Sequence, residues 1–342
     1  MNLIQKLPDV NELISRMSLS EDQKRNHEHA VCEVQEVLSG KSKRKLVIVG
    51  PCSADREDSV LAYMEKLACL AQEVKDRLLV LPRIYTGKPR TNGIGYKGLI
   101  HRPDSGNTND DMVSGIVAMR SMHLRVATET GLFGVDEMLY PETMEYIRDI
   151  LSYVAVGARS VENQGHRLVA SGMEIPVGFK NPTSGDVNVL LNAIKCAQCA
   201  QNLPYCGWSA STKGNIYAHA IMRGFNDRHG RMHPNYHFED MCDLYDAYIK
   251  ADFKNMAVVV DCSHANSRKH YEEQPRIAKE VFALTSQNSQ MMNFIKGLMI
   301  ESYLEDGAQL IGGGVFGKSI TDPCLGWSKT ERLLKELCDA MD

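Results

Sequence analysis

The sequence predicts an α/β protein built as one (β/α)8 barrel, the TIM-barrel architecture, with a helical extension at its N-terminus. Eight short apolar runs alternate with helical patterns, which favours a closed parallel barrel over an open doubly wound sheet. Reactive or charged side chains follow these runs, as expected where a site forms at the carboxyl ends of barrel strands. A barrel needs roughly 250 residues, so the 342 residues can hold one barrel and an extension.

The predicted strands are the apolar runs themselves. They cover residues 46–50, 78–82, 132–136, 154–157, 176–179, 218–222, 257–260 and 297–300. Helical patterns between the runs predict helices that include residues 58–74, 141–153, 186–200 and 238–251. We therefore expect residues 45–342 to form the barrel.

Residues 1–44 are expected to form a separate helical extension. The stretch Ser-Leu-Ser-Glu-Asp at residues 18–22 combines capping and acidic residues that are typical of a helix start. The polar stretch at residues 39–44 is typical of a linker into the first strand.

Composition and charge exclude several classes of protein. Hydrophobic residues make up 43% and charged residues 24% of the chain, which is ordinary for a globular protein with a large core. A net charge of −4 gives no reason to expect nucleic acid or an anionic membrane as partner. No run approaches the roughly 18 apolar residues of a membrane span, and residues 1–6 lack the apolar stretch of a signal peptide. We expect a cytoplasmic protein whose ten cysteines are reduced.

The residues just past the predicted strands would meet at one rim of the barrel. They comprise one thiol, one imidazole, two carboxylates and four cations: Cys52, Arg83, Glu137, Arg159, Lys180, Arg223, His264 and Glu301. Any one of these cations alone could be structural. Four converging cations repel one another unless anions neutralise them, so the rim predicts a ligand that carries phosphate or carboxylate.

Four residues at or beyond strand ends are possible metal ligands: Cys52, His264, Glu301 and Asp322. They belong to the first, seventh and eighth units, which become neighbours when a barrel closes. One thiolate, one imidazole and two carboxylates suit Zn, Fe, Mn or Co better than Ca or Mg. Taken alone, Cys52 is as well explained as a small buried apolar residue, but the joint arrangement favours a metal site.

A glycine-rich motif near the C-terminus invites a different interpretation. Residues 312–319, Gly-Gly-Gly-Val-Phe-Gly-Lys-Ser, match the nucleotide-binding pattern G-x-x-x-x-G-K-S. Such a loop requires a long helix after it, and Pro323 interrupts that helix. A glycine loop leading to Asp322 is the better explanation.

Two further clusters are weak candidates for metal binding. Cys196 and Cys199 form a lone C-x-x-C without the second pair of a zinc site. His229, His233 and His237 recur every four residues, but Gly and Pro between them predict a solvated loop in place of an aligned helical face.

The residues that carry this chemistry resemble a known family, the microbial type I-alpha 3-deoxy-D-arabino-heptulosonate 7-phosphate (DAHP) synthases. Seven segments match in the family's order: residues 50–53 (GPCS), 88–91 (KPRT), 95–98 (GYKG), 157–160 (GARS), 176–181 (PVGFKN), 261–266 (DCSHAN) and 317–322 (GKSITD). The last segment accounts for the nucleotide-like motif, because the family carries it without an ATP site.

The resemblance implies an enzyme that condenses phosphoenolpyruvate with erythrose 4-phosphate, releases phosphate and opens the shikimate pathway. A divalent ion (Mn, Fe, Co or Zn) would be needed. The family also implies a homodimer or homotetramer in which the N-terminal segment makes the contact. By match to the motifs, the metal ligands would be Cys52, His264, Glu301 and Asp322.

The same motifs imply how phosphoenolpyruvate is held. Arg159, Lys180 and Arg223 would bind its phosphate, and Arg83 and Lys180 would bind its carboxylate. Two anionic substrates held close together repel each other, which explains the number of cations at the rim.

The remaining matches concern the sugar and the chemistry. Arg90 and Thr91 would meet the sugar phosphate, Lys88 would lie near the aldehyde as proton donor, and Glu137 would lie near the attacking water. The enol carbon of phosphoenolpyruvate is a weak nucleophile, so the aldehyde must be made more electrophilic by a Lewis acid and a proton donor.

Departures from the family pattern suggest altered regulation. Many relatives carry Phe where Cys262 stands, and this difference concerns the surroundings of the metal ligands. The departures that concern regulation are elsewhere, and one is Glu174, where relatives usually carry a small uncharged residue. The stretch at residues 196–214 looks shorter than the hairpin through which relatives bind inhibitory aromatic amino acids. We therefore expect weak or absent feedback inhibition.

Other enzymes and a non-catalytic barrel are the competing interpretations. A synthase that uses arabinose 5-phosphate, or a metal-dependent aldolase, would share the barrel and the metal. The segment at residues 88–91 is typical of users of the four-carbon sugar. A regulator without turnover is disfavoured because no rim residue looks damaged.

Overall fold

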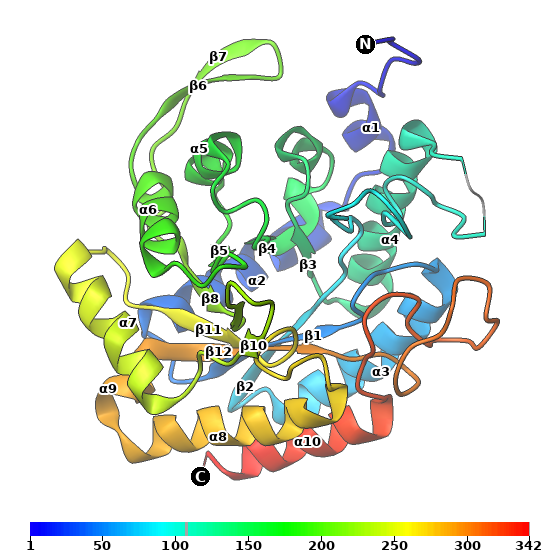
Figure 1. The fold of residues 1–342 in the computed structure, drawn as a ribbon. Coiled ribbons are helices and arrows are strands. Elements are labelled where there is room, and N and C mark those ends of the chain that lie inside the picture. Colours follow the sequence, from blue (N-terminus) through cyan, green and yellow to red (C-terminus); the bar gives the residue numbers. More distant parts are fainter. Residues whose placement is uncertain (107–108, 342) are drawn as a thin grey trace.

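Eight parallel strands form the barrel in the computed structural model, which describes residues 1–106 and 109–341 (Figure 1). The strands are β1 (Lys45–Gly50), β2 (Leu78–Pro82), β3 (Gly134–Glu137), β4 (Leu151–Val156), β5 (Val177–Lys180), β8 (His219–Met222), β11 (Val258–Asp261) and β12 (Ile295–Glu301). Their order is β2-β1-β12-β11-β8-β5-β4-β3. A parallel bridge between Arg83 and Val135 links β2 to β3 and closes the ring.

The predicted fold is confirmed, and every predicted strand overlaps an observed one. The helix predicted over residues 141–153 is wrong. Two short 3₁₀ helices, η1 (Pro141–Tyr146) and η2 (Arg148–Ile150), occupy most of it, and β4 begins at Leu151. Residues 150–156 are buried throughout, so pairing in the sheet outweighs the local helical pattern.

Helices surround the barrel and cap its floor. They are α1 (Val10–Arg16), α2 (Glu21–Ser39), α3 (Glu57–Val74), α4 (Met112–Thr130), α5 (Gln164–Gly172), α6 (Val187–Gln198), α7 (Phe238–Ala251), η3 (Tyr271–Glu273), α8 (Gln274–Gln287), α9 (Ser289–Phe294) and α10 (Trp327–Asp339). In the described part of the chain no helix is long and apolar enough to cross a bilayer. All ten cysteines are free thiols.

The predicted helix start at residues 18–22 is confirmed by the caps of α2. The Ser20 side chain accepts from the Gln23 N–H, and the Gln23 side chain accepts from the Ser20 N–H. This capping box satisfies two backbone donors that the first turn leaves free. Gly40 ends the helix in the left-handed region, with φ of 79°.

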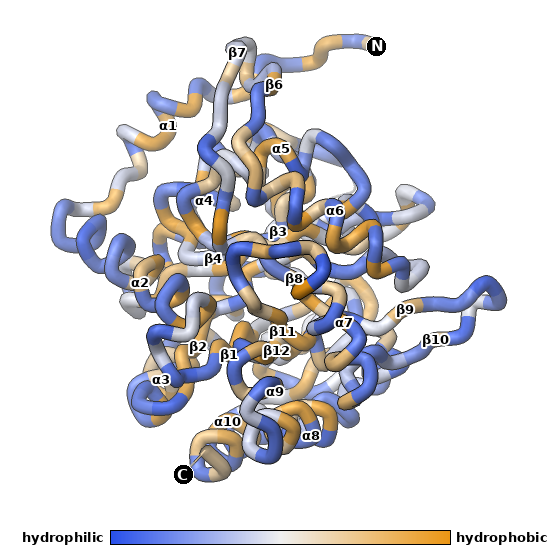
Figure 2. Tube along the Cα trace, turned by 90° about the vertical axis from the view of Figure 1, so that its left-hand side faces the viewer, coloured by the Kyte–Doolittle hydropathy of each residue, from blue (hydrophilic) through white to orange (hydrophobic). Residues whose placement is uncertain are grey.

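Helix α2 closes the amino end of the barrel. Its apolar face carries Val34, Val37 and Leu38, which are fully buried in one cluster with the barrel-interior residues Leu46 and Ile48. Apolar strands occupy the middle of the molecule and more polar helices surround them (Figure 2). The predicted site residues lie at the opposite end, where the strands finish.

Two small hairpins project from the barrel. Strands β6 (Asn202–Tyr205) and β7 (Trp208–Ser211) follow α6, and β9 (Phe225–Asn226) and β10 (Met232–His233) follow β8. The first hairpin lies within residues 196–214. The second contains His229 and His233 of the histidine-rich loop.

A histidine lies inside the barrel without a charged partner among the residues that the structure describes. His219 of β8 is fully buried, and Tyr153 of β4 lies 2.8 Å from its Nε2. Its Nδ1 lies 2.7 Å from the Tyr217 carbonyl, which only accepts, so Nδ1 carries the proton and Nε2 accepts from the Tyr153 hydroxyl. Burial lowers the pKa of His219 to about 4.

This burial predicts a loss of stability in mild acid. The unfolded chain protonates His219 near pH 6.5, and the folded chain does so only near pH 4. Between these values the unfolded state binds more protons, so the free energy of unfolding decreases as the pH is lowered. We expect His219 to contribute about 2 kcal/mol to the decrease in unfolding free energy between pH 7 and pH 5. Urea unfolding of wild type and His219→Gln measures the difference.

The exposed His29 supplies the control for this comparison. His29→Gln should leave the decrease between pH 7 and pH 5 as it is in wild type. An equal decrease in wild type and His219→Gln would contradict the prediction.

Candidate active site

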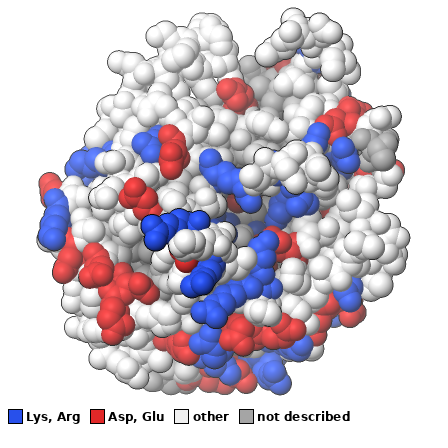
Figure 3. All heavy atoms as spheres, viewed as in Figure 1, with Lys and Arg blue, Asp and Glu red and all other residues white. Residues whose placement is uncertain are grey.

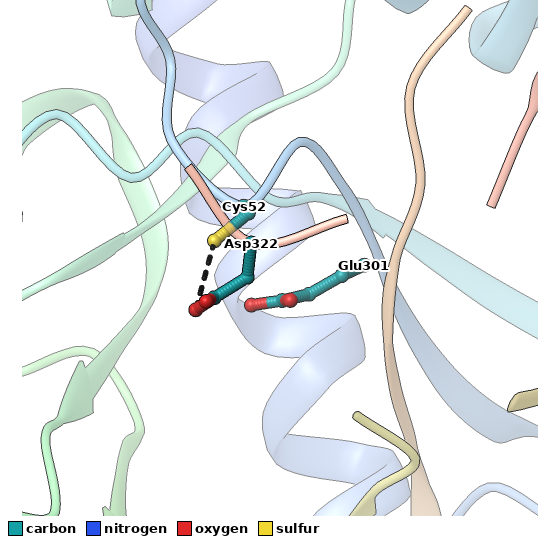
Figure 4. Close-up of side chains that lie close together, drawn as sticks. All are labelled: Cys52, Glu301 and Asp322. Atoms are coloured by element: carbon teal, nitrogen blue, oxygen red, sulfur yellow. Dashed lines mark hydrogen bonds between the residues drawn. The ribbon is translucent and has the colours of Figure 1, made fainter. Parts of the chain in front are cut away.

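The ends of β1 and β12 bring a thiol and two carboxylates together. Gly50 and Glu301 pair in register, which places Cys52 next to Glu301, and the loop before α10 adds Asp322. Ligand atoms of Cys52, Glu301 and Asp322 all lie within 4.8 Å of one another, and the side chains point toward a common centre (Figure 4). Among the described residues this is the one group of three or more His, Cys, Asp or Glu side chains arranged to hold a metal ion.

Lys88 places an ammonium group inside this cluster. Its Nζ lies 2.6 Å from Cys52 Sγ and 3.5 Å from Asp322 Oδ2. Burial alone would lower the pKa of Lys88, but the thiol and carboxylates outweigh it and leave this pKa raised. The cluster therefore attracts a cation even without a metal ion.

Cys52 is protonated in this setting. Burial, and then the charge of Glu301, raise the pKa of Cys52 to about 11, and Lys88 offsets only part of that. A divalent ion has more charge than an ammonium group and favours the thiolate more strongly. Metal binding would thus displace the proton on sulfur.

His264 lies at the edge of the cluster. Its Nε2 is 3.8 Å from Glu301 Oε1, and its Nδ1 is 3.0 Å from Asp261 Oδ2. Burial, together with the cations of Arg223 and Lys180, lowers the pKa of His264. The carboxylate beside Nδ1 favours the tautomer with the proton there, which leaves the Nε2 lone pair facing Glu301. The structure thus brings three of the four predicted ligands into one group, with His264 beside it.

The donor set fits a divalent transition metal. One sulfur, two carboxylates and an adjacent imidazole match the preference of Zn, Fe, Mn or Co. Two further thiols lie near. Cys324 Sγ accepts from the Cys52 N–H at 3.4 Å, whereas Cys262 faces the Val260 carbonyl, 4.0 Å away. Cys324 was not predicted, although Asp322 lies only two residues before it in the sequence.

Arg83 and Lys180 share one aromatic ring beside the cluster. The Arg83 guanidinium lies 3.7 Å from the ring centre of Tyr85, and Lys180 Nζ lies 5.1 Å from the same centre. Arg83 also donates to Glu301 at 3.0 Å and to the Pro51 carbonyl. The negative face of the ring offsets part of the repulsion between the two cations. Sequence reasoning missed Tyr85, because an aromatic residue after an apolar run is most often core.

Lys180 is also held between two carboxylates. Its Nζ lies 3.6 Å from Glu137 Oε2 and 3.4 Å from Asp261 Oδ2. Glu137 fits only because Gly157 lacks a side chain, since a Cβ there would lie 2.5 Å from Glu137 Oε1. These buried acids anchor the ammonium group at the mouth of the barrel.

Two arginines complete this part of the mouth. Arg159 Nε donates to Thr91 Oγ1 at 2.8 Å. Desolvation lowers the pKa of Arg223, whose guanidinium makes no hydrogen bond or ion pair with any residue in the described ranges. Lys and Arg side chains gather around the hollow in the face shown in Figure 3. The mouth thus offers free donors to an anion.

Arg90 lies in a second, more open groove. Its Nε donates to the Tyr96 carbonyl at 2.7 Å, and Ile320 and Thr321 line the other side of this groove of about 770 Å³. A larger cavity of about 1100 Å³ lies at the floor, around Lys45 and Phe133, and contains none of the mouth residues. Of these two cavities, only the groove contains a predicted site residue, Arg90. A third, small pocket is lined by His264, Glu301 and Asp322.

The other motifs lie outside this site. No helix follows Ser319 directly, since α10 begins at Trp327. His233 Nε2 lies 3.1 Å from Asp227 Oδ2 in the exposed β9–β10 hairpin. Cys196 and Cys199 lie at the end of α6, and neither belongs to the metal-binding group found in the described residues.

A closed barrel with a cationic mouth beside a thiol–carboxylate cluster defines an enzyme for anionic substrates. The chain belongs to the DAHP synthetase I family, whose model matches residues 19–335. This confirms the resemblance seen in the sequence. The activity is accordingly that of a 3-deoxy-7-phosphoheptulonate synthase, at the entry to aromatic amino acid biosynthesis.

Curated relatives and a solved structure agree with the family. The chain is 37% identical over 317 residues to the Trp-sensitive phospho-2-dehydro-3-deoxyheptonate aldolase of Escherichia coli K12, covering 90% of this chain and 87% of that one. It is 35% identical over 346 residues to the Phe-sensitive enzyme of the same strain, covering 98% and 94%. The structure of phospho-2-dehydro-3-deoxyheptonate aldolase from Francisella tularensis SCHU S4 superposes with a TM-score of 0.91 at 32% identity, covering 99% of this chain and 98% of that one.

Proposed function

We propose that the mouth binds phosphoenolpyruvate between its cations, as the family resemblance implies. The carrying observation is the guanidinium of Arg223, which is largely buried, lies near Asp261 and Arg159, and makes no hydrogen bond or ion pair with the described residues. Arg159, Lys180 and Arg223 would hold the phosphate. Lys180 and Arg83 would hold the carboxylate, and the buried Nε–H of Arg83 has no acceptor among the described residues.

Erythrose 4-phosphate would enter next to it, with its phosphate on Arg90 and Thr91. Thr91 is already linked to Arg159, so the two phosphate sites adjoin. The sugar then points its aldehyde inward, toward Lys88. Cations shared between the two sites reduce the repulsion of the two anions and hold the reacting carbons together.

The cluster would hold one divalent ion through Cys52, Glu301, Asp322 and His264. When bound, such an ion supplies Lewis-acid polarisation of the aldehyde. Lys88, displaced from the cluster, lies within reach to donate a proton to the sugar oxygen as the enol carbon attacks. We propose Zn, Fe, Mn or Co on the basis of the ligand set.

Glu137 would then act on water. Attack leaves positive character at the carbon that bears the phosphate, and a water added there gives a hemiketal phosphate that loses phosphate. Glu137 is buried beside Lys180, where its carboxylate can orient that water and accept its proton. The same lysine neutralises the departing phosphate.

A phosphate-release assay tests the proposal. Purified enzyme given phosphoenolpyruvate, erythrose 4-phosphate and each divalent ion in turn should release phosphate, and it should release far less with arabinose 5-phosphate. No release with either sugar would revive the non-catalytic barrel, and preference for arabinose 5-phosphate would favour the alternative synthase.

The same assay tests feedback inhibition, which we propose to be weak or absent. Glu174 is exposed, and its carbonyl accepts from Gln35 at 3.2 Å, where the extension meets the barrel. Its charge would disfavour an apolar amino acid there. Activity should persist in millimolar Phe, Tyr or Trp, and inhibition at micromolar concentration by any of them would end this proposal.

Loss of one ligand should weaken metal binding strongly. Asp322→Asn removes a charge from the cluster. Loss of a residue that only orients a metal ligand lowers metal affinity by up to about 100-fold, so we expect loss of a ligand itself to lower the affinity by more than that. Competition titration with a chromophoric chelator and metal analysis of the purified protein measure this without reference to activity. Asp306→Asn changes a carboxylate that pairs with Lys329 at 2.7 Å and should keep the wild-type affinity. Equal affinities in the two variants would contradict the assignment.

We further propose a cytoplasmic homodimer or homotetramer, with residues 1–44 making the contact. The N-terminal segment and the β6–β7 hairpin project from the same side of the molecule (Figures 1 and 2). Both expose large apolar side chains, with Leu3 96%, Ile4 97% and Trp208 77% exposed. Light scattering should give at least twice the chain mass for the full chain and a lower mass after removal of residues 1–8. A monomeric full chain would contradict this.

A further inference from the structure

The position of Arg223 depends on its backbone, because its side chain has no anchor. The guanidinium is buried for the most part and makes no hydrogen bond or ion pair within the described ranges, unlike Arg83 with Glu301 or Arg159 with Thr91. A guanidinium without protein partners is available to bind an anion. The direction of the Arg223 side chain is then set by the backbone from which it extends. Four side-chain hydrogen bonds hold the backbone at residues 222–224. The backbone N–H groups of Ala265 and Asn266 also donate to the Arg223 carbonyl.

Asn181 and Asn266 provide the first of these contacts. The Arg223 N–H donates to Asn181 Oδ1 at 2.9 Å, and Asn181 Nδ2 donates to the Gly224 carbonyl at 2.9 Å. Asn266 Nδ2 donates to the Met222 carbonyl at 3.1 Å. Both amides belong to segments that follow barrel strands, β5 and β11. They connect Arg223 to rigid parts of the fold.

Asn235 joins these two amides and comes from outside the barrel strands. Its Oδ1 accepts from the Gly224 N–H at 2.7 Å, its Nδ2 donates to Asn181 Oδ1 at 3.3 Å, and its N–H donates to Asn266 Oδ1 at 2.9 Å. The Asn235 side chain is 6% exposed. It thus links three hydrogen-bonding groups around one turn.

The backbone at Gly224 is closely packed and leaves no room for a side chain at this position. Gly224 has φ of 73°, and a Cβ there would lie 2.6 Å from the Asn266 nitrogen and 2.7 Å from the His233 carbonyl. The β9–β10 hairpin leaves the barrel at this turn and returns to it at Asn235. The hairpin therefore ends on the same residues that set the direction of Arg223.

We propose that Asn235 is a positioning residue for phosphoenolpyruvate, acting through Arg223. The inference rests on the proposed function, which places Arg223 on the substrate phosphate. Asn235 itself does not touch the substrate. It fixes the turn from which the guanidinium extends, so that its donors meet the phosphate oxygens without reorganisation.

Steady-state kinetics of Asn235→Ala tests this. We expect the KM for phosphoenolpyruvate to rise roughly ten- to a hundredfold, the scale of an ångström-sized misplacement, with the KM for erythrose 4-phosphate within twofold of wild type. Asn215→Ala is the matched control, because Asn215 is also buried and makes three backbone contacts, with Ala170, Ile175 and Tyr217. It should lower the Tm without raising either KM.

A double-mutant cycle separates positioning from general damage. In an Arg223→Ala background, Asn235→Ala should raise the KM for phosphoenolpyruvate no further, because the group that it positions is gone. Additive effects would overturn the inference, as would an unchanged KM in the single variant. If Asn235→Ala does not fold, Asn235→Ser, which keeps a polar group in the buried site, is measured in the same cycle.

The outcomes distinguish this inference from the proposed function. An active wild type whose KM is insensitive to Asn235 leaves the function standing and removes only the positioning role. An Arg223→Ala variant with unchanged KM for phosphoenolpyruvate removes the placement of the phosphate and this inference together. A wild type that releases no phosphate from its two substrates overturns the proposed function itself.

Discussion

Repulsion between like charges at the barrel mouth is the constraint on which the rest of the site depends. Arg83, Lys88, Lys180 and Arg223 meet in a region of low solvent exposure, where each would raise the energy of the others. The fold offsets this with buried acids and with one aromatic ring. Glu301 faces Arg83, Asp261 and Glu137 flank Lys180, and Tyr85 lies under two cations. Arg223 pairs with no acid among the described residues, so its guanidinium is left for an anionic ligand to neutralise.

The acids that stabilise the cations also border the metal-binding cluster. Glu301 contacts Arg83 and belongs to the group with Cys52 and Asp322. Asp261 lies beside both Lys180 and His264. A change of charge in the cluster therefore acts on Arg83 and Lys180 through shared carboxylates, at distances of only 3–4 Å. The candidate metal cluster and the cations of the mouth thus share carboxylates.

Much of the fold and the outline of the site followed from the sequence. Buried parallel strands are continuous apolar runs, and the residue after each run lies at the mouth, so Cys52, Lys180 and Arg223 could be placed without coordinates. The prediction of a helix over residues 141–153 was wrong. The local pattern there is helical, but Leu151 and Tyr153 pair in the sheet with strands that are distant in sequence.

Residues whose roles depend on tertiary contacts could not be identified from the sequence. Tyr85 looks like any core aromatic until its ring is seen under Arg83 and Lys180. Asn235 follows a polar hairpin, and nothing in the local sequence connects it with Arg223, twelve positions earlier. His264 was placed at the mouth correctly, but its distance from the other ligand atoms depends on the left-handed turn at φ of 55°. Such features are set by packing between elements.

Helix α2 also bears on where a ligand can lie. With Val34, Val37 and Leu38 packed against Leu46 and Ile48, side chains fill the amino half of the barrel. Room for a ligand within the ring of strands is therefore confined to the carboxyl half, where Lys180 ends β5 and Cys52 follows β1. A molecule bound there would lie shallow in the barrel and within reach of the loops that follow the strands.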